Sequence, residues 1–180
     1  MSATLDPIAV PADGLAEAKA YLRLDGDTDD ALLTRLTGAA MGLCEGFTGT
    51  ALIARAASEA VPAAREWRRL SLTPVRAITG VDGLDHTGNT VTLAVGAYSI
   101  DIDASGDGWA RANQPGAATR LLVHYEAGLA TDWAGLPEAI RQGIVRLATH
   151  LYSHRDAADE GTPPAAVVAL WRPWRRMRLR

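Results

Sequence analysis

Two histidines, His150 and His154, stand four residues apart in a stretch with helical spacing. On a helix, this spacing can place two imidazoles on one side of a metal ion. The zinc-protease pattern also needs a glutamate directly after the first histidine, but that position is Leu151, and the sequence identifies no third ligand. We therefore favour a histidine pair at a helix end, near the negative end of the helix dipole, over a metal site.

Oxygen-bearing side chains alternate in the segment 101–107, with Gly106 at its sixth position, as at the start of a calcium-binding loop. The twelfth position, where a bidentate glutamate closes such a site, is Ala112. The flanking residues favour strands rather than helices. The sequence therefore predicts an acidic turn that joins two strands.

The sequence lacks the nucleophile elbow G-x-S-x-G, the phosphate-binding loop G-x-x-x-x-G-K and the dinucleotide fingerprint G-x-G-x-x-G. Neither His86 nor His124 has a serine or aspartate at a spacing that selects a catalytic pair. The single cysteine, Cys44, excludes an intrachain disulfide, and we expect it to be a buried packing residue. We thus expect no enzyme activity, no metal and no cofactor, with a hydrolase or metal enzyme as the less favoured alternative.

The last ten residues combine two tryptophans with five arginines, which are residue types that dominate protein interface hot spots. We predict that this segment docks on a protein partner through Trp171, Arg172, Trp174, Arg175, Arg176, Met177, Arg178, Leu179 and Arg180. Two alternatives stay open at this point. The segment could be a solvated basic tail with its indoles folded back on the body, or it could contact nucleic-acid phosphates.

The net charge of −3 is unevenly distributed along the 180 residues. Residues 172–180 carry +5 and no acid, so removing them from the total leaves −8 on the other 171 residues. An acidic body with a basic end indicates that the two meet different surfaces. No apolar run approaches the roughly 20 residues that cross a bilayer, and the N-terminus does not resemble a signal peptide, so we expect no membrane partner.

Helical spacing predicts helices from Asp13 to about residue 24, from Asp27 to Phe47, from Pro137 to about His154 and from Ala165 to Trp171. Asp13 and either Asp27 or Thr28 are the expected N-caps. The second helix is expected to be central to the fold, with an apolar face of Leu32, Leu36, Ala39 or Ala40, Leu43 and Phe47. The apolar faces expected on the first and third helices are Leu15, Ala18, Tyr21 and Leu22, and Ile140, Ile144, Leu147 and Leu151.

Between the second and third helices the pattern changes to β-branched residues, glycine and alternation. Strands are expected at residues 51–61, 67–72, 75–81, 90–95, 98–102 and 119–125, with loops over 1–12 and 103–116. Short consecutive strands with tight turns indicate an antiparallel sheet. In the last strand, Leu121, Val123 and Tyr125 alternate with more polar residues, so one face is expected to be buried.

Several phrases in this order resemble the head–tail connector (adaptor) proteins of tailed phages and gene transfer agents. The segment 15–25 is similar to that family's L-x-E-A-K-x-x-L-R first helix, and 29–33 to its D-D-x-L-L phrase. The segment 44–53 is similar to the family's E-x-x-T-G-R-A-L, although Thr50 stands where the family has arginine. Further likenesses lie at residues 125–128, 136–142 and 150–155, so the resemblance spans about residues 11–172.

The resemblance implies a structural protein that forms a ring, typically of twelve subunits, beneath the portal in the neck of a particle assembled in the bacterial cytoplasm. Its implied partners are further copies of itself, the portal protein and a downstream stopper or tail-terminator protein. The resemblance also implies that DNA passes through the lumen without sequence-specific binding. The implied portal-docking element is the C-terminal segment 171–180. The alternative is a nucleic-acid-binding module that uses the same arginines.

We therefore expect an α+β fold that is mainly a helical bundle with an inserted antiparallel sheet and a C-terminal extension. The chain is expected to form a single adaptor domain. Within it, we expect a helical core at 13–49 and 136–155, a β-region at 50–128, and a C-terminal helix with a docking tail at 163–180.

Overall fold

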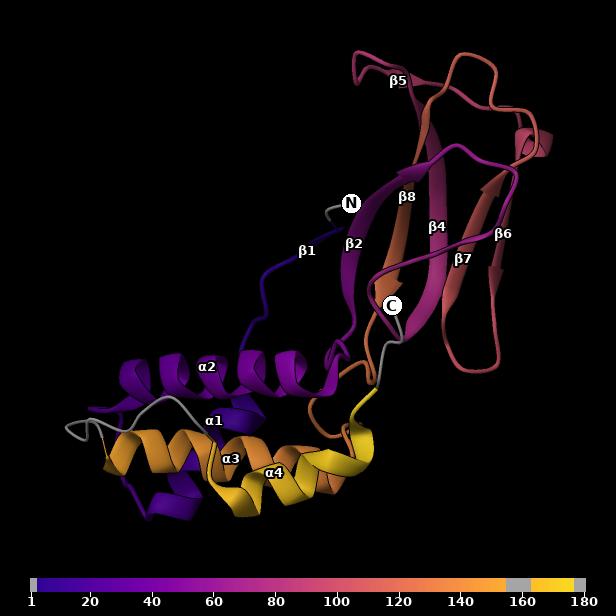
Figure 1. The fold of residues 1–180 in the computed structure, drawn as a ribbon. Coiled ribbons are helices and arrows are strands. Elements are labelled where there is room, and N and C mark those ends of the chain that lie inside the picture. Colours follow the sequence, from indigo (N-terminus) through magenta and orange to yellow (C-terminus); the bar gives the residue numbers. More distant parts are fainter. Residues whose placement is uncertain (1–2, 155–162, 177–180) are drawn as a thin grey trace. The chain divides into compact units, whose positions relative to one another are not determined.

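The computed structural model describes residues 3–154 and 163–176 of the chain, which fall into two compact units (Figure 1). The sheet unit contains residues 3–7 and 54–129, and the helical unit contains residues 8–53, 130–154 and 163–176. The residue range of the sheet unit is close to that of the β-region expected at 50–128, and it also includes the N-terminal residues 3–7. That the two units form one adaptor domain stays a prediction.

The sheet unit consists of two antiparallel sheets. The larger has the strand order β1-β2-β8-β4-β5, and the smaller has the order β3-β7-β6. The strands are β1 (Ala3–Leu5), β2 (Arg55–Pro62), β3 (Arg68–Arg69), β4 (Val75–Leu84), β5 (Thr90–Val91), β6 (Tyr98–Ile102), β7 (Gly108–Ala112) and β8 (Arg120–Ala127), with a 3₁₀ turn η1 at Val95–Ala97. The antiparallel arrangement expected from the short strands and tight turns is therefore confirmed.

Strand β8 is the centre of the larger sheet, because it pairs with β2 on one side and with β4 on the other. Its Leu121, Val123 and Tyr125 are buried and alternate with half-buried neighbours, as the sequence predicts. On β2, Val61 lies opposite Leu121 and Ala57 lies opposite Tyr125, and both are buried as well. One face of the sheet therefore forms an apolar core.

A carboxylate, Glu59, lies inside this core with only 1% of its surface exposed. It accepts hydrogen bonds from the backbone N–H of Ser71 at 2.7 Å, from the Ser71 hydroxyl and from the Tyr125 hydroxyl at 3.2 Å. A buried carboxylate is tolerated when its oxygens are paired in this way. Glu59 thereby connects β2, β8 and the loop at Ser71.

The predicted loops at 1–12 and 103–116 each contain a strand, which corrects the sequence-based assignment. Strand β7 (Gly108–Ala112) alternates small buried residues with Trp109 and Arg111, so its apolar signal is weak. Strand β1 is only three residues long and has no strand pattern in its sequence, so it depends on its pairing with β2. Strands β3 and β5 are shorter than predicted, β2 begins later, and β4 and β8 extend beyond their predicted ends.

The acidic turn predicted at 101–107 does join two strands, β6 and β7. The Asp103 carboxylate accepts hydrogen bonds from the backbone N–H groups of Ser105 and Asp107 and from the indole N–H of Trp109 at 2.9 Å. These bonds, the indole bond first, hold the pKa of Asp103 below its ordinary value. Donors of the protein itself therefore engage this carboxylate.

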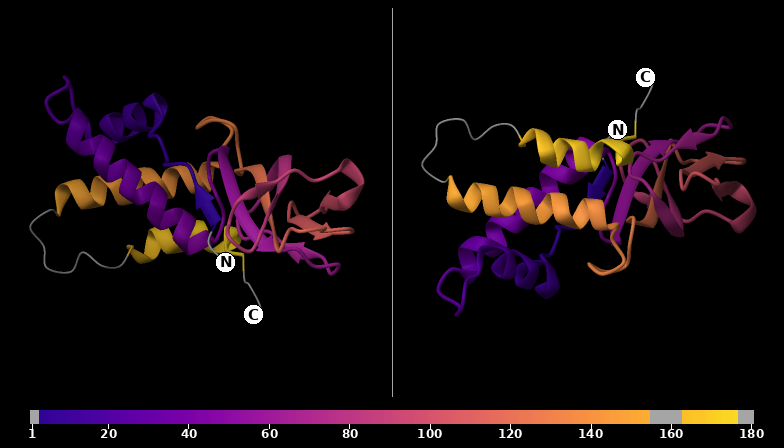
Figure 2. Two further views of the ribbon diagram at one scale, coloured as in Figure 1. Left: turned by 90° about the horizontal axis from the view of Figure 1, so that it is seen from above. Right: turned by 90° about the horizontal axis from the view of Figure 1, so that it is seen from below.

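The helical unit contains α1 (Ala12–Leu22), α2 (Asp30–Thr48), α3 (Glu138–Ser153) and α4 (Ala165–Trp171), followed by a 3₁₀ turn η2 (Arg172–Trp174). Helix α3 packs against each of the other three, and Figure 2 shows α3 and α4 side by side. Ile140, Ile144 and Leu147 of α3 are buried, as predicted. None of the helices in the described part of the chain is long and apolar enough to span a membrane.

The buried face of α2 differs from the predicted one. The residues that α2 buries are Leu33, Thr37, Ala40, Met41, Cys44 and Thr48, whereas Leu43 is 45% exposed. Ala40 is buried as predicted, but the buried stripe otherwise lies about one position further along the helix than the predicted one, and Leu32, Leu36 and Phe47 are only half-buried. Tyr21 of α1 is likewise 58% exposed rather than buried. The burial expected for Cys44 is confirmed.

The helix starts also differ from those expected. Pro11 is the N-cap of α1 and Asp29 is the N-cap of α2, and neither makes a side-chain capping bond. Asp29 instead accepts a hydrogen bond of 3.0 Å from the Tyr152 hydroxyl on α3. A tertiary contact thus uses the carboxylate that would otherwise cap its own helix.

The α+β class is confirmed, but the description as mainly a helical bundle is wrong, since the strands are comparable in extent to the helices. The error arises because alanine and glycine are frequent in parts of residues 50–128. The strand pattern there is therefore weaker than the helical pattern in the rest of the chain.

Replacing the buried carboxylate tests the core of the sheet unit. Glu59→Gln is expected to lower the free energy of unfolding by about 1–3 kcal/mol, because the amide NH₂ would face hydrogen-bond donors. The control Glu126→Gln changes a half-exposed residue of the neighbouring strand and should alter the free energy of unfolding by less than about 0.5 kcal/mol. Urea unfolding of both variants makes the comparison, and equal effects would contradict the role of Glu59.

Candidate functional site

The predicted docking segment begins at a tryptophan that its own subunit buries completely. Trp171 ends α4, and its indole N–H points at the backbone carbonyl of Ile140 at 3.4 Å. Its ring lies against Gly143, where an added Cβ would overlap the indole nitrogen and lie 2.8 Å from Cδ1. Gly143 is therefore the position that lets the indole reach the backbone of α3.

The end of α2 provides the second wall around this tryptophan. The rings of Phe47 and Trp171 are 6.1 Å apart between centroids and inclined by 47°. The guanidinium of Arg175 lies 5.5 Å from the centre of the Phe47 ring, within cation–π range. Phe47 thus contacts the docking segment on both sides of the η2 turn.

A backbone hydrogen bond fixes the segment one residue later. The N–H of Arg176 donates to the carbonyl of Thr48 at 2.8 Å. Carbonyls at the C-terminal end of a helix lack a hydrogen-bond partner within the helix, so the Arg176 N–H satisfies the Thr48 carbonyl at the end of α2. Gly49, in the left-handed region at φ 68°, ends α2 there and has the Arg176 carbonyl near its α-carbon. Residues 171–176 are therefore attached to α2 and α3.

The segment exposes charge beyond its buried start. Arg172, Trp174 and Arg175 are exposed, Trp174 to 37%. Among the residues that the structure describes, neither Arg172 nor Arg175 forms an ion pair. The cationic ends are thus available to an acidic surface. The remaining predicted docking residues Met177, Arg178, Leu179 and Arg180 lie outside the described residues.

Of the two tryptophans, only Trp174 offers an exposed ring. The sequence placed Trp171 among the docking residues and left open that the indoles fold back, and the structure shows Trp171 doing so. Phe47 and Gly143, which hold it, were not expected as part of the site. A glycine on the α4-facing side of α3 was the one available signal, because glycine inside a helix often marks close packing.

The two histidines of the rejected metal site lie at the end of α3. Their rings are 4.2 Å apart, and Nδ1–H of His154 donates to the His150 carbonyl at 3.0 Å. They line a cavity of about 360 Å³ with Arg146, but no group of three metal-binding side chains is present in the described ranges. The arrangement is that of a helix end.

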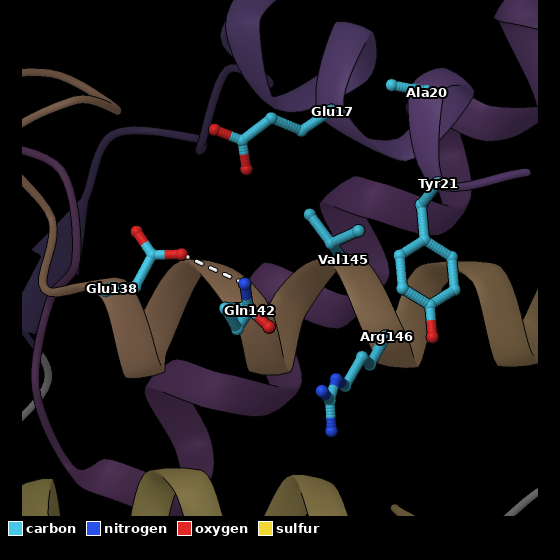
Figure 3. Close-up of a pocket in the computed structure, with 7 residues that line it drawn as sticks. All are labelled: Glu17, Ala20, Tyr21, Glu138, Gln142, Val145 and Arg146. Atoms are coloured by element: carbon cyan, nitrogen blue, oxygen red, sulfur yellow. Dashed lines mark hydrogen bonds between the residues drawn. The ribbon is translucent and has the colours of Figure 1, made fainter.

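A second cavity of about 300 Å³ lies between α1 and α3 and contains ionisable side chains (Figure 3). Arg141 pairs with Glu17 at 3.5 Å and also with Glu138, and Gln142 donates to Glu138 at 3.0 Å. The hydrogen bond from Gln142, followed by that from Arg141, lowers the pKa of Glu138. A carboxylate held ionised in this way is unsuited to act as a general acid at neutral pH.

Filling the space at Gly143 tests the attachment of the docking segment. Gly143→Ala is expected to lower the free energy of unfolding by about 1–3 kcal/mol, because the new methyl group displaces the Trp171 ring. The matched control Gly42→Ala, on an exposed position of α2 with no neighbour within 4 Å, should raise it by about 0.5–1 kcal/mol. Urea unfolding followed by tryptophan fluorescence measures both, and stabilisation by both substitutions would contradict the packing.

Comparison with known proteins gives no match to a family model and no match to a curated protein. Three similar solved structures come from gene transfer agent (GTA) particles. A chain in the neck of an empty GTA particle, computed with C6 symmetry, is 27% identical with a TM-score of 0.78, covering 99% of this chain and 97% of that one.

A chain in the virion of a native GTA particle is 29% identical with a TM-score of 0.75, over 99% of this chain and 97% of that one. A chain in the neck of a native GTA particle, computed with C12 symmetry, is 28% identical with a TM-score of 0.71, over 98% and 97%. This likeness in sequence and over the whole fold confirms the expected resemblance of the chain to a component of the neck of gene transfer agent particles.

Proposed function

We propose that the chain is a structural head–tail adaptor, in which identical copies form a ring in the neck of a phage-like particle. The observation that carries this proposal is the match to GTA neck and virion chains over 98–99% of the present chain. Because both units take part in the match, the likeness extends beyond one common supersecondary motif. The C6 and C12 symmetries of the related necks support a ring of copies.

In this proposal, the C-terminal segment docks the ring on the portal protein. Trp171 and the Arg176 N–H attach the start of the segment to the helical unit, so that the exposed Arg172, Trp174 and Arg175 project from a defined base. The start of the segment is therefore already ordered in the free protein, which reduces the loss of conformational entropy on binding. An acidic groove with an aromatic rim is the partner surface that suits these side chains.

The charge distribution agrees with DNA passing through the ring without being held. The chain outside residues 172–180 carries −8, and a wall of that sign repels the phosphate backbone. The ring would also meet a downstream neck or tail protein on its other side. The likeness to particle components supports a structural role rather than an enzymatic one.

A truncation distinguishes portal docking from nucleic-acid binding. Removal of residues 172–180 is expected to abolish co-purification with a portal ring, while the DNA content of particles that still assemble stays unchanged. The truncation keeps Trp171 in place but removes the Arg176–Thr48 hydrogen bond and the contact of Arg175 with Phe47, so the free energy of unfolding should fall by about 1–2 kcal/mol while the fold is kept, which thermal unfolding measures. Retained portal binding together with loss of DNA binding would instead favour the nucleic-acid-binding alternative.

Point variants test the exposed part of the segment without shortening the chain. The double variant Arg172→Ala and Arg175→Ala is expected to weaken portal binding by at least about tenfold, because charged anchors at interfaces contribute strongly. The control Arg35→Ala removes an exposed arginine of α2 and should leave binding unchanged. Titration of labelled protein onto portal rings gives both dissociation constants, and equal losses would show that only overall charge matters.

A further inference from the structure

A cationic cavity of about 270 Å³ lies on the smaller sheet and takes no part in the docking segment. It is lined by Arg65, Arg111, Ala112, Asn113 and Gln114, with no acidic side chain among them. In the described part of the chain, neither Arg65 nor Arg111 forms an ion pair, and Nε of Arg111 is buried without a hydrogen-bond partner. Two unneutralised guanidiniums beside two amides form a site for anionic oxygens.

The sheet positions this cavity. Arg69 of β3 pairs with Trp109 of β7, and the same antiparallel register places Trp67 opposite Arg111. The Arg111 guanidinium accordingly lies 4.7 Å from the centre of the Trp67 ring, which is 40% exposed. The neighbouring Arg69 is engaged by Asp107 at 2.9 Å. Stacking holds the Arg111 fork in place before any ligand arrives.

The same chain carries a dense run of carboxylates on its helical unit. Four aspartates stand within six residues, three of them (Asp25, Asp27 and Asp29) in the connection from α1 to α2 and the fourth, Asp30, at the first position of α2. Lys19 engages Asp27 and Asp30, and Tyr152 engages Asp29. Asp25 is exposed and makes no ion pair or hydrogen bond among the described residues.

A closed ring of identical copies needs two different surfaces that fit each other, because each contact is head-to-tail. Resting on the proposed function, we infer that the Arg65–Arg111 cavity receives the Asp25 carboxylate of the neighbouring copy. A carboxylate fits the fork of a guanidinium through two parallel hydrogen bonds. The net charge of −8 on the chain outside residues 172–180 repels DNA and so disfavours a phosphate as the occupant. A second copy of the chain, by contrast, brings the Asp25 carboxylate directly to the cavity.

Disulfide trapping in assembled particles tests this contact. The double variant Arg65→Cys and Asp25→Cys is expected to give a ladder of covalent multimers after mild oxidation. The native Cys44 does not interfere, because burial raises the pKa of its thiol and hides it from solvent. The matched control Arg68→Cys and Asp25→Cys uses an exposed arginine that pairs with Ala110, so the register places its side chain on the face of the smaller sheet opposite that of Arg111.

A ladder from the first variant and none from the control supports the contact. No ladder, an equal ladder from both, or a disulfide within one subunit would overturn it. In each of these cases, particles whose necks still contain the chain leave the proposed function standing. Particles without the chain in their necks contradict the proposed function itself.

Charge reversal provides an independent measurement. Arg65→Glu is expected to reduce ring formation on the portal by at least about tenfold, and Asp25→Arg in the same chain should restore it. Thermal unfolding of each variant shows whether the fold is kept. If Arg65→Glu leaves the rings intact but weakens salt-dependent binding of a DNA duplex, the occupant is phosphate and the inference is wrong.

Discussion

The burial of one indole determines where the charged end of this chain can act. Trp171 reaches the backbone of α3 because Gly143 has no side chain, and Phe47 closes the pocket from α2. Burying a tryptophan at one end of a seven-residue helix contributes several kcal/mol, more than so short a helix gains from its own hydrogen bonds. Helix α4 and the arginines that follow it are thus positioned by packing rather than by local propensity.

This attachment combines with the charge pattern. In the proposed function, the acidic body repels DNA phosphates while the basic end binds an acidic protein partner. Within the helical unit, most carboxylates near the helix ends are used locally, as Lys19 and Tyr152 show. Within the sheet unit, by contrast, neither Arg65 nor Arg111 has an ion-pair partner among the described residues, although Arg111 stacks on Trp67, and we propose that these two side chains meet another molecule.

The sequence predicted elements whose signal is local. Helix α3 and strand β6 lie within about one residue of their expected bounds, since their apolar spacing and flanking turn residues agree. It did not predict features that depend on tertiary contacts. The buried positions of strand β7 are Gly108, Ala110 and Ala112, which give a weak apolar signal. The buried face of α2 follows its tertiary contacts rather than its leucines, and the carboxylate of Asp29 accepts a hydrogen bond from α3 rather than capping its own helix. That the segment from Trp171 onward docks on a partner stays a prediction, and the burial of Trp171 depends on Gly143, which lies 28 positions earlier in the printed sequence.

The most direct test of the account is imaging of the neck of particles that contain this chain, at a resolution that traces side chains. We expect a ring of identical copies in which Trp171 stays inside its own subunit and residues 172–180 of every copy lie against the portal. A neck without this chain, or a ring whose arginine segments all face the DNA in the lumen, would contradict it.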